Sequence, residues 1–167
     1  MFKTRQHRQR GISLLELMLA LLVIVAVLFV VSQYFRTARE NLRITQAVEM
    51  VNAIAKASYT WLEGNPNFNS NLTNCSGGTS SPTLICTLVA AGLLPAQYAN
   101  VATVNPWQQA VNAYGRGSDP SQLEIVMYIG LPDSCYNLLY KLQGSVDTIY
   151  CDPNSNLIID FPSETSG

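Results

Sequence analysis

The segment Arg10-Gly11-Ile12-Ser13-Leu14-Leu15-Glu16-Leu17 opens an apolar run that continues to Phe35 and holds a single charged residue, Glu16. The 24 residues from Ile12 to Phe35 would reach roughly 36 Å as an α-helix at about 1.5 Å per residue. Such a helix can cross a hydrocarbon core of about 30 Å with some tilt. The run therefore predicts a membrane-spanning helix.

Glu16 has two interpretations. A carboxylate in lipid is costly, so an ionisable residue inside a membrane segment is by default a functional candidate. However, Ser13-Leu14-Leu15-Glu16 also matches the capping box, in which Ser and Glu side chains satisfy free amide groups at a helix start. Capping does not explain the residues that precede Ser13.

Those preceding residues form a basic leader. Residues 1–11 contain no acid and four cations, Lys3, Arg5, Arg8 and Arg10. Positive charge on this side predicts a cytoplasmic amino terminus. An ordinary secretory signal has an apolar core of about 7 to 15 residues and an Ala-x-Ala-like cleavage site. This run is longer and no such site precedes Arg36, so cleavage behind it is not expected.

The leader, Gly11, the apolar start with Ser13 and Glu16, and the long apolar helix together resemble the class III signal of type IV pilins and type II secretion pseudopilins. In that family a prepilin peptidase cuts after the Gly, methylates the new amine, and leaves the helix in the inner membrane until filament assembly. The resemblance implies cleavage between Gly11 and Ile12, with Glu16 as the assembly glutamate. The chain departs from the family in having Ile12 instead of Phe, and neither Pro nor Gly between Leu17 and Phe35.

The pattern beyond Phe35 predicts that the helix continues. Arg36, Arg39, Glu40 and Arg43 form a charged collar, in which Glu40 is placed to pair with Arg36 and Arg43. Apolar residues then recur with a period near 3.6 and predict one buried stripe, which comprises Ile44, Ala47, Val48, Val51, Ile54, Ala55, Ser58, Trp61 and Leu62. Gly64 is the expected helix end.

We therefore expect an α+β, pilin-like fold, with a long N-terminal helix packed on a small antiparallel-sheet head. Its parts are a removed leader (1–11), a transmembrane or filament-core half of the helix (12–35), an amphipathic half (36–64) and a globular head (65–167).

Within the head, composition predicts a short helix between Pro82 and Gly92 and a second one through Cys135 and Leu142, capped by Asp133 or Ser134. The expected strands are 109–114, 123–129, 148–151 and 157–161. Asn105-Pro106-Trp107 resembles a phrase found before the sheet in type IVb pilins and pseudopilins, although Gln108-Gln109 replaces the Gly that often follows it.

All four cysteines follow the apolar run, which predicts an oxidising compartment and two disulfides. Four cysteines permit three connectivities. Closing the shortest loops costs the least entropy, which favours Cys75–Cys86 and Cys135–Cys151. A metal site is the rival interpretation, but the sequence has no Cys-x-x-Cys and its one histidine, His7, lies in the leader.

Composition argues against several functions. Removing the leader leaves six basic residues against 11 acidic ones, a formal charge of about −5, which disfavours nucleic-acid binding through a basic surface. Without His7 the chain has no histidine and no Gly-rich phosphate loop, so we expect neither an enzyme nor a cofactor. Residues 152–156 could bind calcium weakly, as some pseudopilins do near this end, but their composition favours an ordinary Asx-rich turn.

The expected function is a structural subunit of a type IV pilus-like filament, either a type IVb-like or a minor pilin. Its partners would be the prepilin peptidase, the inner membrane before assembly, and other pilin subunits in an extracellular pilus or periplasmic filament. Two alternatives stay open. One is a pseudopilin of a type II secretion system, and the other is a signal-anchored periplasmic binding domain that never polymerises.

We predict that replacing Gly11 by Ala or a bulkier residue blocks maturation, because a peptidase that approaches the backbone at this junction would tolerate little side chain there. The measurement is mass spectrometry of the mature amino terminus after expression with a prepilin peptidase. Processing of Gly11→Ala at the parent rate would contradict the assignment of the junction.

Overall fold

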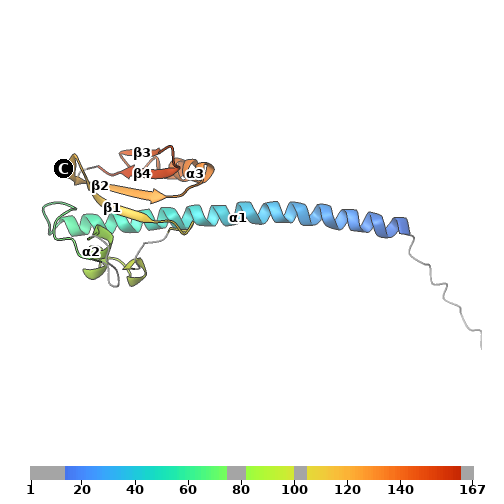
Figure 1. The fold of residues 1–167 in the computed structure, drawn as a ribbon, viewed down its shortest axis with the longest axis horizontal. Coiled ribbons are helices and arrows are strands. Elements are labelled where there is room, and N and C mark those ends of the chain that lie inside the picture. Colours follow the sequence, from blue (N-terminus) through green and yellow to red (C-terminus); the bar gives the residue numbers. More distant parts are fainter. Residues whose placement is uncertain (1–13, 75–81, 100–104, 163–167) are drawn as a thin grey trace, which may run out of the picture. The chain divides into compact units, whose positions relative to one another are not determined.

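The computed structural model describes residues 14–74, 82–99 and 105–162 of the chain (Figure 1). The order of elements is α1 (Leu14–Leu62), α2 (Leu84–Ala90), the 3-10 helix η1 (Ala96–Ala99), β1 (Val111–Arg116), β2 (Asp119–Tyr128), α3 (Pro132–Leu142), β3 (Thr148–Cys151) and β4 (Asn156–Asp160). The fold is α+β, as the sequence predicts. The chain forms two compact units, Met1–Arg39 and Glu40–Gly167, and the boundary between them falls within α1.

Helix α1 spans 49 residues and has two different surfaces. In the first unit every described side chain from Leu14 to Phe35 is exposed. In the second unit one stripe is buried, which confirms the predicted periodicity; its buried members are Ile44, Ala47, Val51, Ile54, Ala55, Ala57 and Ser58. The Ser58 hydroxyl is satisfied locally, since it donates to the Ile54 carbonyl oxygen at 2.8 Å. The helix ends at Leu62, shortly before Gly64.

The four strands form one antiparallel sheet in the order β1-β2-β4-β3. A two-residue turn, residues 117–118, joins β1 to β2, with Arg116 opposite Asp119. The chain then leaves the sheet as α3 and returns as β3, which occupies an edge, while β4 pairs with both β2 and β3. The sequence predicted the four strands but not this order.

Side chains on the inner face of the sheet share one core with the buried stripe of α1. Alternate residues of β2 and β4 point to this face, because side chains along a strand alternate between its two sides. Fully buried examples are Leu123, Ile125, Met127, Leu157 and Ile159. Burial of each such side chain contributes about 1.5 to 3 kcal/mol relative to exposure. The core therefore fastens the sheet to the second half of α1.

Strand β1 starts later and ends later than the sequence predicted, at Val111–Arg116 rather than 109–114. Its extension through Gly115 is accompanied by a tertiary contact at that residue. The Asn69 side chain pairs with the Gly115 backbone through two hydrogen bonds of 2.8 and 3.0 Å. A Cβ atom at position 115 would lie 2.6 Å from the Pro120 carbonyl oxygen, so glycine is required for this close approach.

Both predicted helices in the head are present, but their starts differ from the prediction. Helix α2 is capped by Thr83, whose hydroxyl accepts from the Cys86 amide at 3.3 Å, so Pro82 lies before the cap. Gly92, with φ of +75°, ends this helix as expected. The predicted cap of α3 by Asp133 or Ser134 is wrong, because its N-cap is Leu131, which makes no side-chain cap bond.

Asp160 is 4% exposed, with its Oδ2 atom 3.6 Å from the Arg116 guanidinium. Its Oδ1 atom is buried with no hydrogen-bond partner among the described residues. Burial raises the pKa of this carboxyl above its ordinary value, although Arg116 opposes the shift. A raised folded-state pKa means that ionisation of Asp160 disfavours the folded state. The stability contributed by the protonated carboxyl is therefore present below its ordinary pKa and is lost as pH rises through the raised, folded-state pKa.

We expect Asp160→Asn to gain stability relative to the parent as pH rises from about 3 to about 7, because the amide cannot ionise. Chemical denaturation of both proteins at the two pH values measures the difference. Asp133→Asn, at an exposed position on α3, is the matched control and should show no such trend. If the parent instead became more stable than Asp160→Asn as pH rises, the attraction between Asp160 and Arg116 would outweigh the cost of burying the carboxylate.

Candidate membrane-anchoring and assembly site

The first unit presents an apolar helix surface with one carboxylate. Glu16 lies in the first turn of α1 and is exposed. Gly11, Ile12 and Ser13 lie outside the described residues, so the processing junction and the capping box stay predictions. By length and composition, α1 is a helix that could cross a membrane. Both interpretations of Glu16 are compatible with its position.

Glu40, in the second unit, joins three segments of the chain. Its Oε1 atom accepts from Trp107 Nε1 at 3.1 Å and from the Ser134 hydroxyl at 2.5 Å. Its Oε2 atom lies 3.7 Å from the Arg43 guanidinium. We call these four residues the Glu40 junction. It connects α1 to the turn before β1 and to the first turn of α3.

The sequence anticipated only part of the Glu40 junction. The expected pair with Arg43 is present, whereas no pair between Glu40 and Arg36 is found in the described parts of the chain. Ser134 was expected to cap α3 and instead donates to Glu40. The sequence drew attention to Trp107 only through the motif Asn105-Pro106-Trp107. That motif did not indicate that Trp107 would donate to Glu40.

Asn105 builds the turn that positions Trp107. Its side chain is buried, and its Oδ1 atom accepts from the amides of Trp107 and Gln109 at 2.9 and 3.1 Å. Its Nδ2 atom donates to the Tyr128 carbonyl oxygen at 2.6 Å. Gln108 has φ of +61°, in the left-handed region that glycine adopts without strain. This is the position where the resembled phrase often carries Gly.

A disulfide joins Cys135 of α3 to Cys151 of β3, with 6.2 Å between their Cα atoms. This is one of the two predicted pairs. The other, Cys75–Cys86, stays a prediction because Cys75 lies outside the described residues, while Cys86 is buried on α2. Disulfides persist in oxidising compartments, so this pair indicates an extracytoplasmic head.

The turn at residues 152–156 uses the Asp152 carboxylate internally. The oxygens accept from the amides of Asn154 and Asn156 and from the Asn156 side chain, at 2.8 to 2.9 Å. These bonds to Asn156 and Asn154 lower the pKa of Asp152 despite some desolvation. Across the described ranges, no group of three His, Cys, Asp or Glu side chains could hold a metal ion. The geometry is that of an Asx-rich turn.

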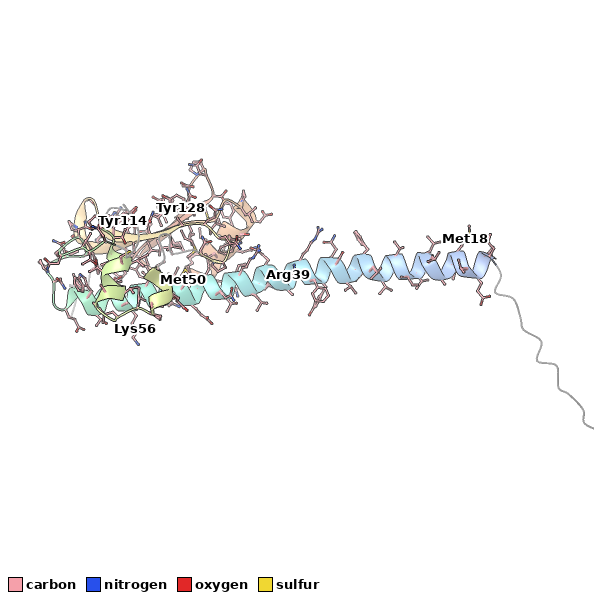
Figure 2. The ribbon with its side chains drawn as sticks, turned by 60° about the horizontal axis from the view of Figure 1, so that its bottom comes forward. Met18, Arg39, Met50, Lys56, Tyr114 and Tyr128 are labelled. Atoms are coloured by element: carbon pink, nitrogen blue, oxygen red, sulfur yellow. A yellow bond between two sulfur atoms is a disulfide. The ribbon has the colours of Figure 1, made fainter. Side chains whose placement is uncertain are left out.

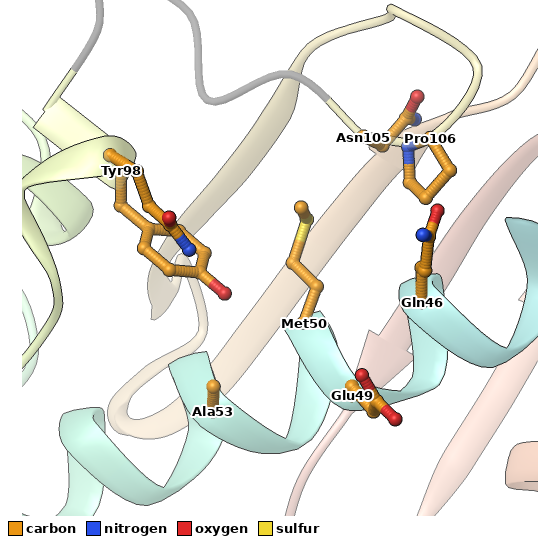
Figure 3. A pocket seen from close by; sticks show the side chains of 8 residues that line it. Gln46, Glu49, Met50, Ala53, Tyr98, Asn105 and Pro106 are labelled. Atoms are coloured by element: carbon orange, nitrogen blue, oxygen red, sulfur yellow. The ribbon is translucent and has the colours of Figure 1, made fainter.

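A pocket of about 440 Å³ lies beside the second half of α1 (Figure 3). Its described lining comes from α1, η1 and the turn before β1, and consists of Gln46, Glu49, Met50, Ala53, Gln97, Tyr98, Asn105 and Pro106. Among these residues only Glu49 is charged at neutral pH, and the Asn105 amide is committed to its turn. The described lining therefore offers no paired acid and base.

No family model matches the chain, and a comparison with curated proteins finds no match. The architecture is pilin-like. It combines an apolar N-terminal helix, the continuation of that helix into a head, and a four-stranded antiparallel sheet with a disulfide at one edge. These features agree with the fold that the sequence resemblance implied.

We expect Glu40→Ala to lower the free energy of unfolding of the head by about 2 kcal/mol. The reason is that Trp107 and Ser134 would lose an ionised acceptor, and hydrogen bonds to charged groups contribute about 1.5 to 3 kcal/mol. Thermal or chemical denaturation of the detergent-solubilised chain would measure the change. Glu40→Gln should lose less, and Glu49→Ala, at an exposed position of α1, should be nearly neutral. Equal stabilities for Glu40→Ala and Glu49→Ala would show that the junction contributes little.

Proposed function

We propose that this chain is a structural subunit of a type IV pilus-like filament, inserted in the inner membrane before assembly. The observation that carries the proposal is the position of Glu16. It is the one charged residue in an otherwise uncharged apolar helix that continues into a disulfide-bonded α+β head. A basic leader and Gly11 directly precede this helix. The proposal includes no catalytic activity.

Apolar packing would supply most of the cohesion between subunits. Every side chain from Leu14 to Phe35 is exposed in the single chain, including leucines more than half exposed. Exposed apolar area of this extent needs lipid or other apolar helices around it. Transfer from lipid into a helical filament core would keep this surface away from water throughout assembly.

Glu16 would fix the axial alignment of neighbouring subunits rather than supply most of the attraction between them. Cleavage after Gly11 would free the α-amine of Ile12, four residues before Glu16. A positive amine on one subunit and the Glu16 carboxylate on its neighbour would then offset each other's desolvation. Leaving one partner of a buried charge pair alone costs about 3 to 5 kcal/mol, so misaligned subunits would be disfavoured.

A pseudopilin of a type II secretion system is the second candidate, because it would share the leader, the helix and Glu16. Two features favour the pilus. The head carries a disulfide between α3 and β3, and the Asp152 turn uses its carboxylate for internal hydrogen bonds rather than presenting an open calcium site. An anchored domain that never polymerises is the third candidate, and an intact Gly11 junction in the purified protein would favour it.

We expect Glu16→Ala to be inserted and processed normally but to enter filaments poorly, with Glu16→Gln intermediate because it keeps a polar acceptor without the charge. Filament yield after shearing, together with mass spectrometry of the amino terminus, separates assembly from processing. Glu49→Ala serves as the carboxylate control on the same helix. Normal filament yield from Glu16→Ala would favour the capping interpretation and remove the inter-subunit role.

A further inference from the structure

The outer face of the sheet carries three tyrosines and two carboxylates, Glu124 and the buried Asp160 directly across from it on β4. Cross-strand register places Tyr114 opposite Glu124, and Ile158 opposite both Val126 and Tyr150, so these side chains share one face. Tyr128 follows Val126 by two residues and points the same way. We call Tyr114, Glu124, Val126, Tyr128, Tyr150 and Ile158 the outer tyrosine face. Figure 2 shows Tyr114 and Tyr128 on one side of the head, with Met50 and Lys56 of α1 on the other.

The chemistry of the outer tyrosine face suits a guanidinium group. Tyr114, Tyr128 and Tyr150 are 37%, 37% and 46% exposed, so their rings are accessible. The Tyr114 hydroxyl donates to Glu124 Oε1 at 2.7 Å, and no described residue occupies Glu124 Oε2. Arginine stacks on aromatic rings and bonds carboxylates through its planar fork of donors.

One cation of the head, Arg116, already reaches this face, because its partner Asp160 is the cross-strand neighbour of Glu124. Arg116, the nearest by sequence, pairs with Asp160 at 3.6 Å and donates to Gln122 at 3.3 Å. Burial and the bond to Glu124 raise the pKa of the Tyr114 hydroxyl above its ordinary value of 10.0, so it stays a neutral donor. Glu124 therefore lies beside Tyr114 with no ion-pair partner among the described residues.

The chain itself carries a matching pair of cations. Arg36 and Arg39 are exposed on α1 and form no ion pair within the described ranges, whereas Arg43 is engaged by Glu40. Residues three apart on a helix have Cβ atoms roughly 5 to 6 Å apart. Facing residues on neighbouring strands have a similar Cβ separation of about 4.5 to 5.5 Å. Two such arginines could therefore contact neighbouring strands of one sheet.

We propose that the outer tyrosine face of one copy binds Arg36 and Arg39 of a second copy. The inference rests on the proposed function, since filament assembly is what brings copies side by side. The contact would couple the head of one subunit to the helix of its neighbour, at a place separate from Glu16. It would also give a role to three accessible tyrosines on the same face as Glu124.

Charge exchange in the full-length chain tests the contact. Arg39→Glu and Glu124→Arg should each lower the yield of sheared filaments about tenfold, which corresponds to about 1.4 kcal/mol. The double variant should recover most of the loss, because the opposite charges are restored in exchanged positions. Lys56→Glu, which reverses another exposed cation on α1, is the control and should assemble normally. If both single variants are folded and the double variant does not recover filament yield, the proposed contact is wrong.

Lipid headgroups are the competing partner for the arginines. In that case Arg39→Glu would reduce the amount of membrane-inserted precursor, and Glu124→Arg would assemble normally. This pattern would also overturn the proposal.

A cross-linking measurement keeps the test independent of the folding of Glu124→Arg. A photoreactive phenylalanine analogue at Tyr128 should form an adduct, in assembled filaments, with the peptide of another copy that contains Arg36 and Arg39. The same analogue at Tyr140, which is 72% exposed on α3, should not. Adducts that map to other peptides would show that the proposed contact is wrong and would leave the proposed function standing. A parent chain that forms no polymer would contradict the proposed function as well.

Discussion

The carboxylate of Glu40 is the constraint on which the arrangement of the head depends. A half-buried carboxylate needs hydrogen bonds to replace lost water, and it obtains them from Trp107 and Ser134. These donors belong to the turn before β1 and to the start of α3. A single acceptor on α1 thus sets where the chain enters the sheet and where it leaves it again. The core residues supply most of the stabilisation, while this polar contact selects one arrangement.

The two surfaces of α1 reflect two different environments for one continuous helix. From Ile44 onward an apolar stripe is covered by the head, so water reaches only the opposite side. From Leu14 to Phe35 every side chain is exposed, so no described part of the chain covers this half of the helix. The second half of the helix is therefore stabilised by its own head, while the first half requires an external apolar partner. Lipid and neighbouring helices could both fill this role, which in the proposed function would be the physical basis for moving from membrane to filament.

The two faces of the sheet differ in composition. Its inner face is aliphatic and belongs to the core, whereas its outer face presents tyrosines and Glu124. The disulfide at β3 and the Asn69 contact at β1 hold the two edge strands. Both edge strands are therefore tied to other parts of the head, on either side of the outer face. This division would suit the proposed subunit, whose cohesion would come from its helix and whose outer tyrosine face would bind the helix of a neighbour.

Local sequence patterns were enough to predict the long helix, its buried stripe, the existence of four strands, the end of α2 at Gly92 and the Cys135–Cys151 pair. Each depends on periodicity, backbone preference or loop length within a short window. Strand order, the extension of β1 through Gly115, and the partners of Glu40 could not be read in this way. The bonds from Trp107 and Ser134 to Glu40 span 67 and 94 residues, and no short-range preference encodes them. Gln108 shows the same limit, since its left-handed backbone is imposed by the Asn105 turn against the preference of the residue itself.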